Sequence, residues 1–158
     1  MFSKTTEYAL RATIFIAKES SVDKKLSIDE ITKAIDSPHS FTAKVLQLLT
    51  KDNKVVSSVR GPGGGFYVSE ADKKLSARSI LAATDEEHIL TKCVLGLKQC
   101  SEVQPCPMHE QYKVIKQQLV KLFDSKTIGE LAAEMNSEQV VLNNFKTKPA
   151  SAIKRRRR

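Results

Sequence analysis

All three cysteines of the chain lie in one short segment. Cys93, Cys100 and Cys106 are separated by six and five residues, and His109 follows three positions after the last of them. Thiolate sulfur and imidazole nitrogen are ligands for soft metal ions and iron–sulfur clusters. Cysteine is also a common small buried residue, but buried cysteines have no reason to gather in one segment. The clustering therefore favours a metal or redox function.

The cysteine spacing discriminates between kinds of metal centre. Structural zinc sites favour closely paired ligands such as Cys-x2-Cys, and this segment contains no such pair. An iron–sulfur cluster is bulkier than one ion and suits thiolates that approach from a wider loop. A redox enzyme would need a Cys-x-x-Cys motif or a cofactor fingerprint, and the sequence has neither. The spacing therefore favours a cluster over a zinc ion, which stays the alternative metal.

The last cysteine begins the motif Cys106-Pro107-Met108-His109. Proline suits the first position of a helix, so we expect Cys106 at a helix N-terminus, where free backbone amides and the helix dipole stabilise a thiolate. His109 would lie about one turn further and face the same ligand. Its alternative is an ordinary surface histidine.

The segment after the cysteines predicts a long helix. Tyr112, Ile115, Leu119 and Leu122 are spaced three, four and three residues apart, which is a heptad-like stripe able to pair with a partner helix. Thr127 and Glu130 form a capping-box pattern that begins a last helix. We interpret residues 107–135 as a dimerisation helix followed by a final short helix.

The first half of the chain predicts three helices. Apolar residues recur at helical spacing over residues 5–18, and Ser27 with Glu30 forms a capping box for a second helix that ends at Ile35. Ser37-Pro38 is a start signal for a third helix reaching about Lys51. That helix is expected to bury four apolar residues, Phe41, Val45, Leu48 and Leu49. Four small or polar residues would then share its opposite face: Ser40, Ala43, Lys44 and Gln47.

Two short β-like runs follow, over residues 55–59 and 66–68, and a glycine-rich tip joins them. Three helices followed by a hairpin are the order of a winged helix-turn-helix, whose third helix can enter the DNA major groove. The glycines do not form a nucleotide-hydrolysis loop, because no Gly-Lys-Ser/Thr closes them. The predicted fold is thus mainly α with a small β-hairpin, with residues 1–83 as the winged domain and 84–106 as the cysteine-rich loop.

Charge and hydropathy restrict the partners. The formal net charge is +8, and Lys154 with Arg155–Arg158 supplies five of these charges. We expect residues 136–158 to form a disordered basic tail, so the net charge by itself does not indicate DNA binding. No apolar run is long enough for a membrane span, and the first residues do not resemble a secretory signal. We therefore expect a cytoplasmic protein without a membrane partner, whose cysteines are thiolates rather than disulfides.

Two segments resemble one family of regulators. Residues 56–66, Val-Ser-Ser-Val-Arg-Gly-Pro-Gly-Gly-Gly-Phe, resemble the wing of the IscR/NsrR-type (BadM-like) winged-helix iron–sulfur transcriptional regulators, and residues 8–12 resemble their first helix. The cysteine segment with its trailing Cys-Pro-Met-His is similar to their cluster-binding loop. The resemblance covers roughly residues 4–131.

The resemblance implies a homodimeric repressor or activator that binds a palindromic site on double-stranded DNA. Its iron–sulfur cluster, 2Fe–2S in preference to 4Fe–4S, would be held by Cys93, Cys100, Cys106 and His109, with Glu7 as the alternative fourth ligand. Cluster loss or oxidation would change DNA affinity in response to redox state, nitric oxide or iron–sulfur supply. A cluster-free thiol switch on the same fold is the alternative function, ahead of a redox enzyme.

The same resemblance makes the third helix and the wing the DNA-contacting elements. Lys44 would meet phosphate or guanine and Gln47 an adenine edge, while Ser40 and Ala43 permit close approach. Arg60 would reach a narrow minor groove, and the wing glycines would let the backbone approach the phosphates. The expected set is Ser40, Ala43, Lys44, Gln47, Arg60, Gly61, Gly63 and Gly64. Its alternatives are a solvated helix face and a plain flexible hairpin.

Overall fold

A computed structural model describes residues 1–52, 55–136 and 141–143 of the chain. It is mainly helical with one two-stranded antiparallel hairpin, which confirms the predicted fold class. The helices are α1 (Lys4–Glu19), α2 (Ile28–Ile35), α3 (His39–Thr50), α4 (Arg78–Ala83), α5 (His109–Ser125) and α6 (Ile128–Glu134). Between them lie the strands β1 (Ser57–Val59) and β2 (Gly65–Tyr67) and the 3-10 turns η1 (Asp72–Lys74) and η2 (Glu87–Leu90).

Both predicted capping boxes are present. The backbone N–H of Ser27 donates to the Glu30 carboxylate at 2.7 Å, and that of Thr127 donates to Glu130 at 2.8 Å. These hydrogen bonds lower the pKa of both carboxyl groups. The starts of α2 and α6 are therefore determined by local side-chain chemistry, as expected from the sequence.

The start of α3 differs from the prediction. The helix begins at His39 with Pro38 as its N-cap, and no side chain caps it, because the Ser37 hydroxyl is hydrogen-bonded to the Thr42 hydroxyl instead. The predicted buried face was also partly wrong, since Leu46 is buried while Phe41 and Leu48 are only half-buried. The buried residues are Thr42, Val45, Leu46 and Leu49. This wider stripe packs α3 against both α1 and α2.

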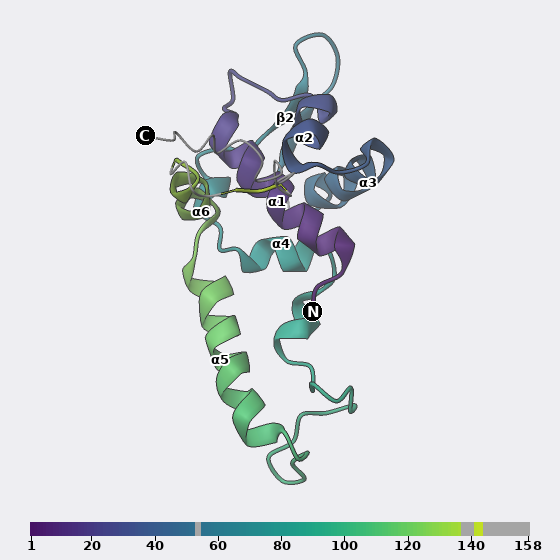
Figure 1. Ribbon diagram of the computed structural model, residues 1–158. Coiled ribbons are helices and arrows are strands. Elements are labelled where there is room, and N and C mark those ends of the chain that lie inside the picture. The colour runs from purple at the N-terminus through teal and green to yellow at the C-terminus, as the bar shows by residue number, and fades with distance from the viewer. Residues whose placement is uncertain (53–54, 137–140, 144–158) are drawn as a thin grey trace, which may run out of the picture.

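One hydrophobic core holds the winged domain together. Helix α1 lies at its centre and packs against α2, α3 and α6 (Figure 1). Ile16, Ile31 and Leu46 are fully buried in this core. Ile128 of α6 belongs to the same core, so the last helix, which the sequence grouped with α5, packs on the winged domain.

The hairpin pairs Ser57 with Tyr67 and Val59 with Gly65. Its second strand also pairs with the connection between α1 and α2, because Phe66 and Leu26 exchange backbone hydrogen bonds of 2.8 and 2.9 Å. The first strand begins at Ser57, two residues later than expected. The preceding residues, Val55 and Val56, are fully buried in the core. The wing is thereby fastened to the domain at its base.

Helix α5 and the cysteine loop form an arm that leads away from the winged domain (Figure 1). The helix begins at His109 with Met108 as N-cap, and the Cys106 carbonyl accepts a hydrogen bond from the His109 N–H at 2.9 Å. The expectation that Cys106 lies at the helix N-terminus was therefore wrong. The predicted basic tail, 136–158 with Arg155–Arg158, lies largely outside the described residues.

Candidate nucleic-acid interface and cysteine site

The four residues predicted for the face of α3 share one surface. Ser40, Lys44 and Gln47 are exposed and Ala43 is half-buried, and all four line one shallow hollow on the helix. The opposite stripe of α3 is buried. A polar, open helix face of this kind is suited to entering a major groove. Contact with DNA itself stays a prediction.

The wing continues this surface. Ala43 and Gln47 also line a second hollow that extends to Ser58 and Arg60 on the hairpin. Arg60 is exposed, so its guanidinium and the face of α3 can meet one ligand. Sequence reasoning missed Ser58. Because side chains two residues apart along an extended chain lie on the same face, Ser58 could have been placed beside Arg60.

Glycine is favoured at different positions of the wing tip for different structural reasons. Gly61 and Gly63 are exposed with positive φ angles of 90° and 73°. At Gly64 a Cβ atom would lie 2.2 Å from the Val59 carbonyl oxygen, and its N–H donates to the Gly61 carbonyl at 2.9 Å. Gly64 is therefore required to close the turn, whether or not DNA contacts it.

The cysteine loop brings the predicted ligands together as two pairs. All three cysteines are free thiols; Cys93 is buried, and Cys100 and Cys106 are half-exposed. Cys106 lies close enough to Cys93 to lower the pKa of that thiol, and the Cys100 sulfur lies 3.5 Å from His109 Nδ1. Within the described part of the chain, no three Cys, His, Asp or Glu side chains converge on a single metal-ion position.

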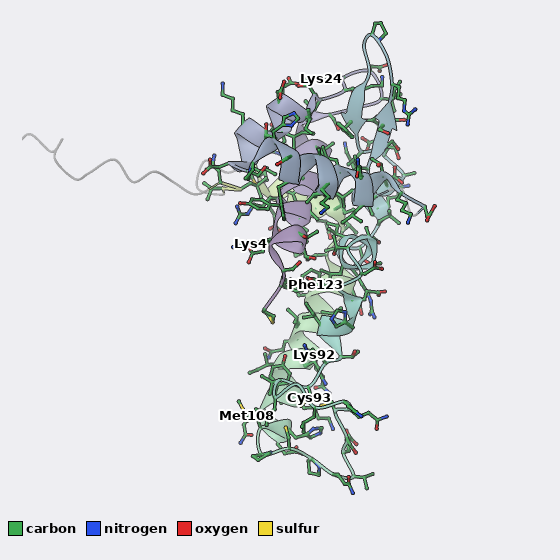
Figure 2. The ribbon with its side chains drawn as sticks, turned by 90° about the vertical axis from the view of Figure 1, so that its right-hand side faces the viewer. Lys4, Lys24, Lys92, Cys93, Met108 and Phe123 are labelled. Atoms are coloured by element: carbon green, nitrogen blue, oxygen red, sulfur yellow. The ribbon has the colours of Figure 1, made fainter. Side chains whose placement is uncertain are left out.

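A hollow of about 1050 Å³ lies between the loop and α5, and Cys93, Cys100 and His109 line it. Figure 2 shows Cys93 and Lys92 beside the end of α5 near Met108, far from Lys24 at the winged end. The helix contributes a basic face to this hollow, formed by Lys113, Lys116, Gln117, Val120 and Lys121. Sequence reasoning missed this face, although its helical spacing opposite the apolar stripe was readable.

The electrostatics of the loop favour a thiolate at Cys93. Backbone N–H groups of Leu95 and Leu97, the Cys106 thiol and the charge of Lys116 together lower the pKa of Cys93 below its ordinary value, although burial opposes the shift. His109 is buried and its Nε2 atom has no hydrogen-bond partner. The donor atoms available here are three thiol sulfurs and one buried imidazole nitrogen without a hydrogen-bond partner. These are the atom types that bind an iron–sulfur cluster.

Glu7, the alternative fourth ligand, lies elsewhere in this chain. Its carboxylate pairs with Lys4 at 2.6 Å, and the hydrogen bond from Lys4 lowers the pKa of the carboxyl group. It is not among the residues that line the cysteine hollow. Within one chain the structure therefore places His109, and not Glu7, beside the cysteines.

Arg78 connects the arm to the winged domain. Its Nε donates to Glu87 of η2 at 2.6 Å, and its Nη1 donates to Asp124 of α5 at 3.1 Å. Its own helix, α4, packs against α1 and α3. Arg78 therefore joins three segments: η2, from which the stem of the cysteine loop (residues 87–91) is built, the C-terminal end of α5, and its own helix α4, which contacts α3.

A winged helix with an open recognition face, fastened to a separate helical arm, defines a winged-helix DNA-binding protein. The family model of Rrf2, described as an iron-dependent transcriptional regulator, matches residues 2–134. The chain therefore belongs to the Rrf2 family, whose transcriptional regulators bind DNA.

Curated relatives agree with this assignment. The chain is 33% identical over 133 residues to a helix-turn-helix-type transcriptional regulator of Aquifex aeolicus, covering 83% of this chain and 90% of the relative. It is 30% identical over 138 residues to one of Haemophilus influenzae, covering 87% and 90%. Because its homologues are named as transcriptional regulators, the chain is a regulator and not an enzyme.

Solved structures share the fold. CymR, the global cysteine regulator of B. subtilis, matches with a TM-score of 0.68 and 18% identity over 85% of this chain and 97% of that one. T. potens IscR matches with a TM-score of 0.65 and 16% identity over 89% and 92%. At these identities the likeness shows the fold alone. No helix among the described residues is both long and apolar enough to cross a membrane.

Proposed function

We propose that the chain is a homodimeric transcriptional regulator whose affinity for a palindromic DNA site responds to an iron–sulfur cluster held by Cys93, Cys100, Cys106 and His109. The observation that carries the proposal is a hollow lined by the free thiols of Cys93 and Cys100 and by His109, whose buried Nε2 has no hydrogen-bond partner, with the third thiol, Cys106, close to Cys93. The likeness to T. potens IscR supports this proposal.

The residues of the loop have separate tasks in this proposal. When bound, the cluster supplies a centre that gains charge on reduction and is lost on oxidation. Cys93 provides a thiolate that backbone amides already stabilise. Cys100 and His109, in contact with each other, bind from the α5 side of the hollow. Binding all four side chains would order the segment from Cys93 to Cys106 against the helix.

Helix α5 supports dimerisation. It has 17 residues, of which only His109 and Phe123 are buried. Val114, Ile115 and Leu122 are 54%, 57% and 51% exposed. A second copy of the same helix would cover this apolar stripe and place two winged domains for two half-sites.

Arg78 offers a physical route for coupling. A change in the loop acts on η2, which Arg78 joins to α4 and α5, and α4 contacts α3. A coupling free energy of about 1 to 3 kcal/mol changes DNA affinity roughly 5- to 150-fold. A small shift between the two recognition helices of a dimer is sufficient for such an effect.

A cluster-free thiol switch is the second candidate. It is favoured by the contact between Cys93 and Cys106, by the lowered pKa of Cys93 and by the fold likeness to CymR. In this case thiol oxidation, and not cluster loss, would change the loop. Such a protein would stay colourless when purified without oxygen.

Anaerobic purification with an absorption spectrum and iron and sulfide analysis separates the two candidates. A cluster gives a brown protein with absorption near roughly 400 nm, and DNA affinity that changes when the protein is bleached by air or nitric oxide. Cys106→Ala should abolish this response, whereas Ser101→Ala in the same loop should preserve it. A colourless protein after reconstitution would overturn the cluster, and an unchanged response in Cys106→Ala would overturn the assignment of that ligand.

A further inference from the structure

Two lysines one turn apart on α5 hold the cysteine loop near both of its ends. Lys116 Nζ donates to the backbone carbonyl of Thr91 at 3.0 Å, two residues before Cys93. Lys113 Nζ forms an ion pair with the carboxylate of Glu102, two residues after Cys100. The basic face of α5 is therefore in direct contact with the loop at two points.

The two contacts differ in charge. The carboxylate of Glu102 balances the charge of Lys113, whereas Lys116 bonds to a neutral carbonyl and keeps its full positive charge at the hollow. The lining of the hollow contains one carboxylate, that of Glu102. It contains five lysines, Lys92, Lys98, Lys113, Lys116 and Lys121. The hollow consequently has excess positive charge, and Lys116 is fixed by its hydrogen bond instead of extending into solvent.

We propose that Lys116 has two linked tasks: it fastens the stem of the cysteine loop to α5, and it is the counter-charge of the sulfur centre formed by the cysteines. The second task rests on the proposed cluster. Thiolates and sulfide bring negative charge into the hollow, and reduction adds one more charge. A nearby fixed cation stabilises the more negative state by Coulomb attraction. Lys116 therefore raises the reduction potential of the centre and is a positioning residue for it.

Four proteins test the counter-charge: the full-length wild type, Lys116→Gln, Lys116→Arg, and the double variant Lys113→Gln/Glu102→Gln. The double variant removes the other contact without changing net charge. Each is reconstituted anaerobically, assayed for iron and sulfide, and titrated for its reduction potential. We expect Lys116→Gln to bind the same iron and sulfide with a more negative potential. Lys116→Arg and the double variant should keep the wild-type potential. A Lys116→Gln potential equal to that of the wild type would overturn the counter-charge.

Hydrogen exchange of the apoprotein tests the fastening without any cluster. Loss of a hydrogen bond from a charged donor should increase amide exchange around Thr91 and Cys93 on the order of tenfold in Lys116→Gln. Lys116→Arg should restore slow exchange, and Lys74→Gln, an exposed lysine of η1 outside the hollow, should leave it unchanged. Unchanged exchange in Lys116→Gln would overturn the fastening. A wild type that takes up no iron or sulfide would refute the cluster itself, and exchange would still decide this part of the inference.

Discussion

The winged domain and the arm formed by the cysteine loop with α5 are built on different physical principles. In the winged domain, residues such as Ile16, Ile35 and Leu49 have no exposed surface. In the arm, α5 buries only two of its residues. Leu90 and Phe123 form a small apolar cluster with Leu81 at the junction with the winged domain, and beyond this cluster the loop is held by polar contacts such as that of Lys116. The domain is stabilised by apolar burial within one chain, whereas the arm leaves the apolar side chains Val114, Ile115 and Leu122 of α5 exposed.

The contrast explains where regulation can act. A region with as much buried apolar surface as the winged core unfolds cooperatively and does not rearrange piece by piece. A segment held by a few half-exposed hydrogen bonds has a low free energy of opening, so a bound group or a second copy can change it. Under the proposed function, the arm is therefore the region that responds to the signal, and the winged domain is the stable part that binds DNA.

The largest expected effect concerns the core of the winged domain. Leu46→Ala should lower the free energy of unfolding by about 2–5 kcal/mol, because it removes a fully buried side chain from a packed core. Val22→Ala, at a side chain that is 56% exposed, should change it by about 0.5 kcal/mol or less. Urea unfolding followed by circular dichroism measures both. Equal effects of the two changes would contradict the contrast between core and surface.

The next effect concerns self-association. Ile115→Glu places a charge on the exposed apolar stripe of α5 and should weaken dimerisation on the order of a hundredfold or more, because an unpaired charge is costly to bury in an interface. Gln117→Glu, on the face that lines the hollow, adds the same charge away from the stripe and should leave dimers intact. Sedimentation velocity over a range of concentrations compares them. A fully dimeric Ile115→Glu would exclude the stripe as the interface.

DNA binding should separate two residues of α3. Gln47→Ala should reduce discrimination between bases by about 1–3 kcal/mol at one position of the site. Lys44→Ala should weaken binding to all sequences and reduce the salt dependence by about one phosphate contact. Both can be measured by fluorescence anisotropy with the target and scrambled duplexes at several salt concentrations. If both variants bound DNA like the wild type, this face of α3 would not be the reading surface.

The smallest effect concerns the capping box of α6. Hydrogen bonds from Thr127 keep the pKa of Glu130 below its ordinary value of 4.5. Since the folded pKa is the lower one, the carboxylate stabilises the protein above pH 4.5, and this stabilisation is lost as the pH falls through the folded pKa. Glu130→Gln should therefore be less stable than the wild type at pH 7, with the difference shrinking toward pH 3. Urea midpoints across this range measure it; a difference independent of pH would refute the role of the charge.

Local signals predicted much of the fold. The capping boxes at Ser27 and Thr127 appear as expected, because both partners of each lie within four consecutive residues. The amphipathic face of α1 and the glycine-rich turn of the wing are local in the same sense. The start of α3 was misassigned because Ser37 has a competing partner, Thr42, that its sequence signal does not reveal.

The candidate site was predicted less completely. The clustering of three cysteines with His109 was visible in the sequence, and the structure brings Cys93, Cys100 and His109 to one hollow, with Cys106 close to Cys93. Their division into two pairs was not visible, because it depends on how an irregular loop folds back on α5. The basic face of that helix was missed for a related reason. Surface lysines are ordinarily solvated, and only the position of the loop makes Lys113 and Lys116 part of the site.

Residue types and short spacings are enough to predict the order of the elements, the open face of α3, the glycine-rich wing and the gathering of thiols. The folded structure adds three contacts: α6 packs against α1, Arg78 joins η2 to α5, and Lys116 donates a hydrogen bond to the carbonyl of Thr91. These contacts join residues far apart in the chain, and their free energy depends on a packing arrangement that no local pattern encodes.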